Sequence, residues 1–244
     1  MARFSTATTI INRAAVEVGL TSVVDPVNSE DSSFIQLTEL LNGAGQELVE
    51  LHAWQGLVAT YQLTTTALDT GEYALPDDFS YMIDQTGWEL SNAVPLGGPL
   101  SAQDWTYLAG RNLVSQTIYA SFRFYDDKFN IFPQDPVTAG LDINFEYISR
   151  NWVTEQTTGT MKDYVTIGSD IVMYEAILII KFLKLKFLES KGFDASSAKT
   201  EFEILFFSRT GKDTGAPILS ASGRRSGIPF LSPYRNTPDS GYGG

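Results

Sequence analysis

Cysteine is absent from this 244-residue sequence, and histidine occurs once, as His52. The first absence excludes disulfides, thiolate metal sites and a cysteine nucleophile. The single histidine excludes any site that needs two imidazole groups. We therefore expect neither a cofactor nor a bound metal ion.

Basic residues are scarce as well. The chain has 17 Lys and Arg against 29 Asp and Glu, a formal net charge of −12. No Lys or Arg occurs between Arg13 and Arg111, whereas fourteen acidic residues lie from Glu17 to Asp104. A groove that grips nucleic acid needs several cations against the phosphates. The acidic front half therefore argues against sequence-specific DNA binding.

Long uninterrupted apolar runs are also missing. The longest apolar stretch, Ile171–Leu188, contains Glu175 and three lysines, so it predicts a buried helix and not a membrane span. The first residues lack the apolar segment of a signal peptide. We expect a protein that is soluble and cytosolic when it is made, without a membrane partner.

Two helices are predicted in the first 57 residues. Ser5 or Thr6 is a suitable N-cap for the first helix, and Gly19 a suitable stop. The second helix is expected to begin near Asp31 or Ser32, because apolar residues then recur in steps of three and four. Gly43 and Gly45 lower the helix propensity of this segment, which suggests a close helix contact.

The periodicity changes between residues 58 and 166, where alternating segments predict strands. The clearest are 117–124, 129–132 and 142–147, with Asp126-Asp127 as a turn; 58–66 and 72–75 are expected to add two more. A short helix is predicted after Ser101, which resembles an N-cap. This block is predicted to be an inserted, antiparallel β-rich domain.

Helical patterns return at 167–191 and 195–207. The predicted fold class is therefore α+β: a helical bundle formed from N- and C-terminal segments, with an inserted antiparallel β-rich domain and an extended C-terminal arm. The predicted division is 1–57 and 167–210 for the helical domain, 58–166 for the insertion and 211–244 for the arm.

The C-terminal segment from Gly211 has 7 Gly, 4 Pro and 5 Ser among its 34 residues and a net charge of +2. Such a composition cannot bury enough surface to fold alone. Its apolar residues are Ile218, Leu219, Ile228, Phe230, Leu231 and Tyr234. A disordered end is one interpretation, and an arm that becomes ordered on a partner's surface is the other.

Candidates for chemistry are few. Asp77-Asp78 and Asp126-Asp127 are paired carboxylates, but adjacent side chains point apart and both pairs occur where turns are expected. His52 is a possible general base without a partner in the sequence, or a residue that complements the end of a helix. Lys181, Lys184 and Lys191 share one helical face, which is typical of a solvated or ion-paired surface. We predict that the protein is not an enzyme.

One segment carries a family resemblance. Tyr73-Ala74-Leu75-Pro76-Asp77-Asp78-Phe79-Ser80-Tyr81-Met82-Ile83-Asp84, followed by Trp88 and residues 94–105, resembles the head-to-tail adaptor proteins of short-tailed phages, also called tail tubular protein A or gateway proteins. The helix from Ala7 to Ala14 and the Asp25-Pro26 turn fit the same family. The likeness covers about residues 1–210.

The resemblance implies a structural virion protein that forms a ring of twelve copies beneath the portal of a DNA-filled capsid. It also implies the tail nozzle or tube protein below the ring, and tail fibres or spikes at its side. The C-terminal arm would dock against the portal. We assign this contact to six residues: Arg224, Arg225, Ile228, Phe230, Leu231 and Tyr234.

A conduit for DNA must not hold it, and acidic walls repel phosphates. We therefore expect genome DNA to pass through the ring without specific binding. The alternative function is that of a β-rich carbohydrate-binding virion module, in which exposed aromatic residues would serve as sugar platforms.

Overall fold

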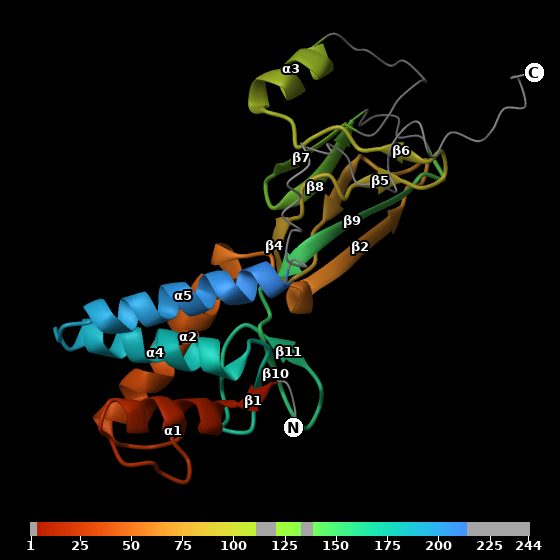
Figure 1. The fold of residues 1–244 in the computed structure, drawn as a ribbon. Coiled ribbons are helices and arrows are strands. Elements are labelled where there is room, and N and C mark those ends of the chain that lie inside the picture. The colour runs from red at the N-terminus through yellow and green to blue at the C-terminus, as the bar shows by residue number, and fades with distance from the viewer. Residues whose placement is uncertain (1–3, 111–120, 133–138, 214–244) are drawn as a thin grey trace, which may run out of the picture.

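The computed structural model describes residues 4–110, 121–132 and 139–213 of the chain. Five α-helices occur in these ranges: α1 (Ala7–Glu17), α2 (Ser32–Leu51), α3 (Ala102–Gly110), α4 (Ala176–Ser190) and α5 (Ser196–Asp213). A 3₁₀ turn, η1 (Gln55–Leu57), precedes the β-rich part. Figure 1 shows a helical part and a β-rich part that extends away from it. The α+β fold class is thus confirmed.

The helix ends follow the predicted capping residues. Thr6 is the N-cap of α1, where its hydroxyl accepts a hydrogen bond from the Thr9 N–H. Asp31 caps α2 through a bond from the Ser33 N–H. After α1, Gly19 has a φ of +85°, the left-handed conformation that glycine adopts at a helix end.

The helical core surrounds α4, which packs against α1, α2 and α5. Seven α4 residues are buried, so this helix is apolar on most of its circumference, as predicted. Phe202 of α5 stacks on Phe182 of α4 with their ring centroids 4.3 Å apart. Trp152, Val153 and Val165 lie in the same core, so the chain returns to the helical part well before α4 begins.

The strands of the described residues form three sheets. Their bounds are β1 (Ser5–Thr6), β2 (Val58–Thr64), β3 (Glu72–Ala74), β4 (Phe79–Met82), β5 (Trp88–Glu89), β6 (Val94–Pro95), β7 (Ser121–Tyr125), β8 (Lys128–Phe132), β9 (Asp142–Ser149), β10 (Val153–Thr154), β11 (Met161–Lys162) and β12 (Ile171–Val172). The sheet orders are β1-β12-β10-β11, β2-β9-β5-β6 with β4 also paired to β9, and β3-β8-β7. All of their strand pairs are antiparallel.

The second and third sheets share an aromatic core. Phe122, Phe129 and Phe145 are buried there, and the Phe129 and Phe145 ring centroids are 5.0 Å apart. The predicted turn at Asp126-Asp127 joins β7 to β8, and both residues have positive φ. Ser101 accepts a hydrogen bond from the Asp104 N–H at the start of α3, as predicted.

The predicted helix over 167–191 was wrong in its first part. The helix begins only at Ala176, and Ile171–Val172 is a strand that pairs with β1 and β10. The preceding loop is fixed by Asp170, whose carboxylate accepts hydrogen bonds from the Thr166 and Ile167 N–H groups. A short apolar run has no periodicity that separates a buried strand from a buried helix.

The suggested close helix contact in α2 takes another form. A Cβ atom at Gly45 would lie 2.3 Å from the indole of Trp152, which follows β9, whereas Gly43 has open space at the same position. Gly45 therefore makes room for a tryptophan ring and not for a helix. At position 43 there is room for a side chain as well as for glycine.

Candidate functional site

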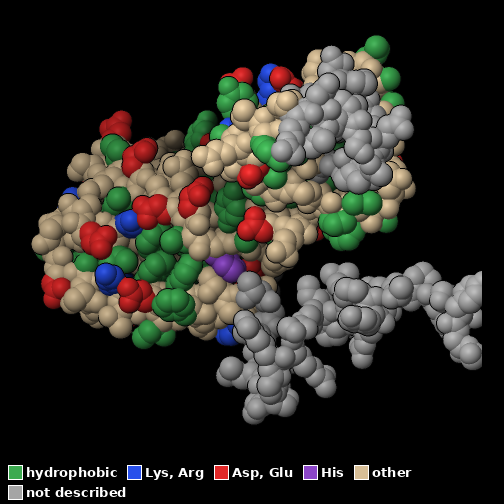
Figure 2. All heavy atoms as spheres, turned by 90° about the horizontal axis from the view of Figure 1, so that it is seen from above, with side chains coloured by type: hydrophobic (Ala, Val, Ile, Leu, Met, Phe, Trp, Pro, Cys, Tyr) green, Lys and Arg blue, Asp and Glu red, His purple; other side chains and the backbone are tan. Residues whose placement is uncertain are grey.

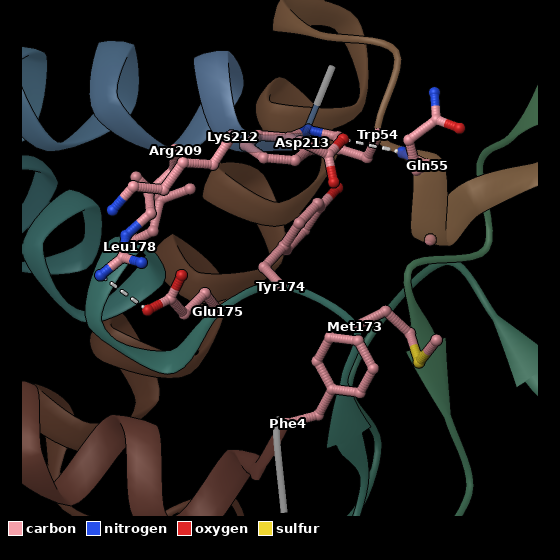
Figure 3. A pocket seen from close by; sticks show the side chains of 11 residues that line it. Phe4, Trp54, Gln55, Met173, Tyr174, Glu175, Leu178, Arg209, Lys212 and Asp213 are labelled. Carbon is pink, nitrogen blue, oxygen red and sulfur yellow. Dashed lines mark hydrogen bonds and ion pairs between the residues drawn. The ribbon is translucent and has the colours of Figure 1, made fainter. Parts of the chain in front are cut away.

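The six residues assigned to the portal contact, Arg224, Arg225, Ile228, Phe230, Leu231 and Tyr234, lie outside the described residues. The structure does describe where their segment begins, because α5 continues to Asp213. The last residues of α5, Arg209 to Asp213, are here called the root of the C-terminal segment. A cleft of about 400 Å³ surrounds this root. Figure 3 shows its lining, which comes from four separate parts of the chain: Phe4 before β1, the turn after α2, the start of α4 and the end of α5.

Asp213 joins the end of α5 to the turn before β2. Its Oδ2 atom accepts a 2.9 Å hydrogen bond from the Gln55 N–H and lies 3.4 Å from Nε2 of His52. His52 is the C-cap of α2. Sequence reasoning gave this histidine no partner; its carboxylate partner lies 161 positions further along the chain, where α5 ends. The contact fixes the place from which the C-terminal segment leaves.

Aromatic rings form the inner wall of the cleft. The Trp54 indole N–H donates to the Leu48 carbonyl, and the Tyr174 hydroxyl donates to the Gly45 carbonyl. Burial raises the pKa of the Tyr174 phenol, so this group stays a neutral donor. Phe206 of α5 packs edge-on against Trp54. These contacts hold the last turns of α5 against the end of α2.

An ion pair closes the opposite side. Nη2 of Arg209 lies 2.8 Å from Oε1 of Glu175, the residue before α4 (Figure 3). Together with Asp213, this pair ties the C-terminal end of α5 at two points. The end of α5 is therefore held to the start of α4 and to the turn after α2.

The paired carboxylates have structural partners. The Tyr147 hydroxyl donates to Asp78, and Arg150 donates through its side chain to the Asp77 carbonyl oxygen. Burial and the bond to Asp78 raise the pKa of Tyr147 to about 12. Asp126 and Asp127 occupy the hairpin turn between β7 and β8. Each pair thus serves a turn, as the turn interpretation of the sequence predicts.

Lysines of α4 bind acids of two neighbouring helices. The ammonium groups of Lys181 and Lys184 both lie within 4 Å of Glu17 of α1 and Glu201 of α5. Hydrogen bonding to Glu17 is the main cause that raises the pKa of Lys181. Lys191 instead lies over the Phe187 ring. The predicted ion-paired face is confirmed for the first two lysines.

The tryptophans do not gather into a sugar platform. Trp54 and Trp152 are buried in the helical core, whereas Trp88 in β5 is 37% exposed. Trp105 of α3 packs edge-on against Phe132. Within the described ranges, no cluster of three or more metal-ligating side chains occurs, and no helix there is long and apolar enough to cross a bilayer.

The acidic side chains that dominate the charge of the sequence are spread over the surface of the molecule. Figure 2 shows acidic side chains over both parts of the molecule, with hydrophobic side chains among them on the helical part. On α5, Ile204 is 67% exposed and Phe207 is 73% exposed. These two residues stand one helical turn apart and form an apolar patch, here called the α5 patch. Both residues lie away from the buried side of α5, which contains Ala198 and Phe202, so they depart from the amphipathic pattern of the helix.

The fold, with its helical core and its β-rich core, defines an α+β protein. Residues 5–211 match the family model of the SU10 adaptor protein. The chain therefore belongs to the SU10 adaptor protein family, a family of phage adaptors that are structural components of the virion. A comparison with curated proteins gives no match. The predicted adaptor identity is confirmed at this level, and the assignment to short-tailed phages stays a prediction.

Proposed function

We propose that the protein is a head-to-tail adaptor that forms a ring between the portal and the tail nozzle. The observation that carries this proposal is the family match over residues 5–211, which includes both the helical part and the β-rich part. Twelve copies would surround a central channel for the genome. The role requires no catalysis and no cofactor, and it places the protein in the virion after synthesis in the host cytoplasm.

Contacts between copies are supported by the α5 patch. Ile204 and Phe207 expose apolar side chains at the surface of a helix whose opposite side is buried on α4. Covering them in an assembly would stabilise it by removing apolar surface from water. A neighbouring copy in the ring is the partner that we assign to this patch.

The portal contact is assigned to the C-terminal segment. Its root is fixed by Asp213 and Arg209, so the residues beyond it start from a defined place. The segment adds Arg224 and Arg225 to the apolar Ile228, Phe230, Leu231 and Tyr234. A polar and apolar arm of this kind can order on a partner's surface.

The remaining partners follow from the adaptor role. The tail nozzle or tube protein would lie below the ring, and tail fibres or spikes would attach at its side. Genome DNA would pass without being held, because the front half presents acids and no Lys or Arg between Arg13 and Arg111.

The test is negative-stain imaging of the purified protein mixed with the portal of the same phage. We expect a ring with a central hole, seated on the portal. Three forms are compared: the full chain, a chain truncated after Asp213, and a full-length Phe230→Ser/Tyr234→Ser variant. Truncation after Asp213 keeps the bond to Gln55 intact.

We expect both altered forms to fold and to lose portal binding. A full chain that gives no ring with portal would contradict the adaptor proposal. Rings that form equally well with the truncated chain would contradict the assigned role of the six arm residues.

A further inference from the structure

Strand β2 is an edge strand with one side unpaired. It pairs with β9 from Val58↔Ile148 to Thr64↔Asp142, and β9 pairs with β4 and β5 on its other side. No strand in the described part of the chain pairs with the outer side of β2. Figure 1 shows β2 at the border of the β-rich part.

The direction of each β2 peptide group follows from the hydrogen bonds of β9. The carbonyls of Asp142 and Glu146 accept bonds from Leu90 and Ile83, on the side of β9 away from β2. Backbone groups of successive residues alternate between the two sides of a strand. The β2 partners of these even-numbered residues therefore point outward: Thr60, Gln62 and Thr64 direct their N–H and C=O groups away from β9.

These outward groups are open to a further strand. Among the described residues, the backbone of Thr60, Gln62 and Thr64 makes no hydrogen bond on the outer side. Natural edge strands are commonly protected by lysine, proline or a bulge. The sequence of β2, VATYQLT, contains no charge and no proline, and its register with β9 is continuous. Such an edge is a template for an added strand.

The C-terminal segment begins beside this edge. Asp213 is hydrogen-bonded to the Gln55 N–H, and Val58 at the start of β2 is three residues further on. Thirty-one residues follow Asp213. Four of them, extended at about 3.3 Å each, span roughly 13 Å, which is enough to reach the first half of β2 from this anchor.

The segment contains one stretch suited to pairing. Residues 218–222, Ile-Leu-Ser-Ala-Ser, are the longest run without Gly or Pro beyond Asp213. Every residue of this run can donate its N–H. We propose that Ile218–Ser222 adds to the outer edge of β2 of the same chain, as a parallel strand. This inference does not depend on the adaptor role, and it leaves residues 224–235 available for the portal.

Amide hydrogen exchange, resolved residue by residue on the full-length protein, tests the pairing. Tyr61 and Leu63 direct their N–H groups to β9 and serve as internal controls. We expect Thr60, Gln62 and Thr64 to be protected at least tenfold relative to unstructured amides. In a Ser220→Pro/Ala221→Pro variant we expect this protection to be lost at the three outward amides and kept at the two controls.

Ser240→Pro is the matched control, since it places proline in the same segment outside the proposed strand. It should leave all five amides unchanged. Fast exchange of Thr60, Gln62 and Thr64 in the unmodified protein would overturn the proposal. So would protection that survives the double proline variant, or protection that disappears on dilution and thus comes from another copy.

Discussion

Gly45 lies in α2 where the ring of Trp152 approaches the helix backbone. A Cβ atom there would be 2.3 Å from the indole Cε2 and Cζ2 atoms, far inside van der Waals contact. We expect Gly45→Ala to lower the free energy of unfolding by about 1–3 kcal/mol through overpacking. At Gly43 a Cβ atom would meet open space, so we expect Gly43→Ala to raise the free energy of unfolding by up to about 1 kcal/mol. Urea unfolding of both variants checks this; equal stability of the two would contradict it.

Asp170 provides a pH-dependent contribution to stability. Burial raises the pKa of its carboxyl, but bonds from the Ile167 N–H, the Lys162 ammonium and the Thr166 N–H outweigh burial and hold the pKa below its usual value. Because the pKa of Asp170 is lower in the folded than in the unfolded protein, its carboxylate stabilises the fold at pH values above the unfolded pKa of about 4. This contribution is lost as the pH falls through the folded-state pKa.

We expect Asp170→Asn to destabilise the protein by about 1–3 kcal/mol at pH 7. The difference from the unmodified protein should shrink as the pH falls below about 4. Urea unfolding at several pH values measures it, with Asp84→Asn at an exposed position as the control. A difference that stays constant with pH would show that the carboxylate charge is not the cause.

At the scale of the element, α5 has two apolar sides with different roles. Phe202 stacks on Phe182 of α4, whereas Phe207 is 73% exposed. We expect Phe202→Ala to cost about 3 kcal/mol in stability, as for other buried phenylalanines. Phe207→Ala should change stability by less than about 0.5 kcal/mol and weaken ring assembly on the portal. The assignment would be contradicted if Phe207→Ala lowered stability as Phe202→Ala does, or if Phe207→Ala left ring assembly unchanged.

At the scale of the whole molecule, the charge distribution governs the response to DNA. The net charge of −12 and the acidic front half predict repulsion of phosphates. We expect the purified protein not to retard duplex DNA in a gel at about 50 mM salt, where cationic DNA-binding proteins bind most strongly. Retardation that disappears on raising the salt to about 200 mM would contradict the prediction and reveal an unrecognised cationic surface.

Local patterns predicted much of the architecture. The caps at Thr6 and Asp31, the hairpin turn at Asp126-Asp127 and the β9 alternation depend on neighbouring residues, so a short window of sequence contains their cause. The helix start at Ala176 was missed because the short apolar run 171–174 continues directly into the apolar helix and has no period that separates strand from helix. The conformation of this run is decided by pairing with β1 and β10, which a window around it does not include.

The sequence by itself determined the acidic front half, the absence of cysteine chemistry, the main helices and the longer strands, and the resemblance to a phage adaptor. These properties reside in composition and in short-range periodicity. Tertiary structure alone decided that Asp213 meets His52 and Gln55, that Trp152 fills the space above Gly45, and that β2 is an open edge. Each of these joins residues far apart in the chain, and such contacts form only when packing of the two cores brings distant segments together.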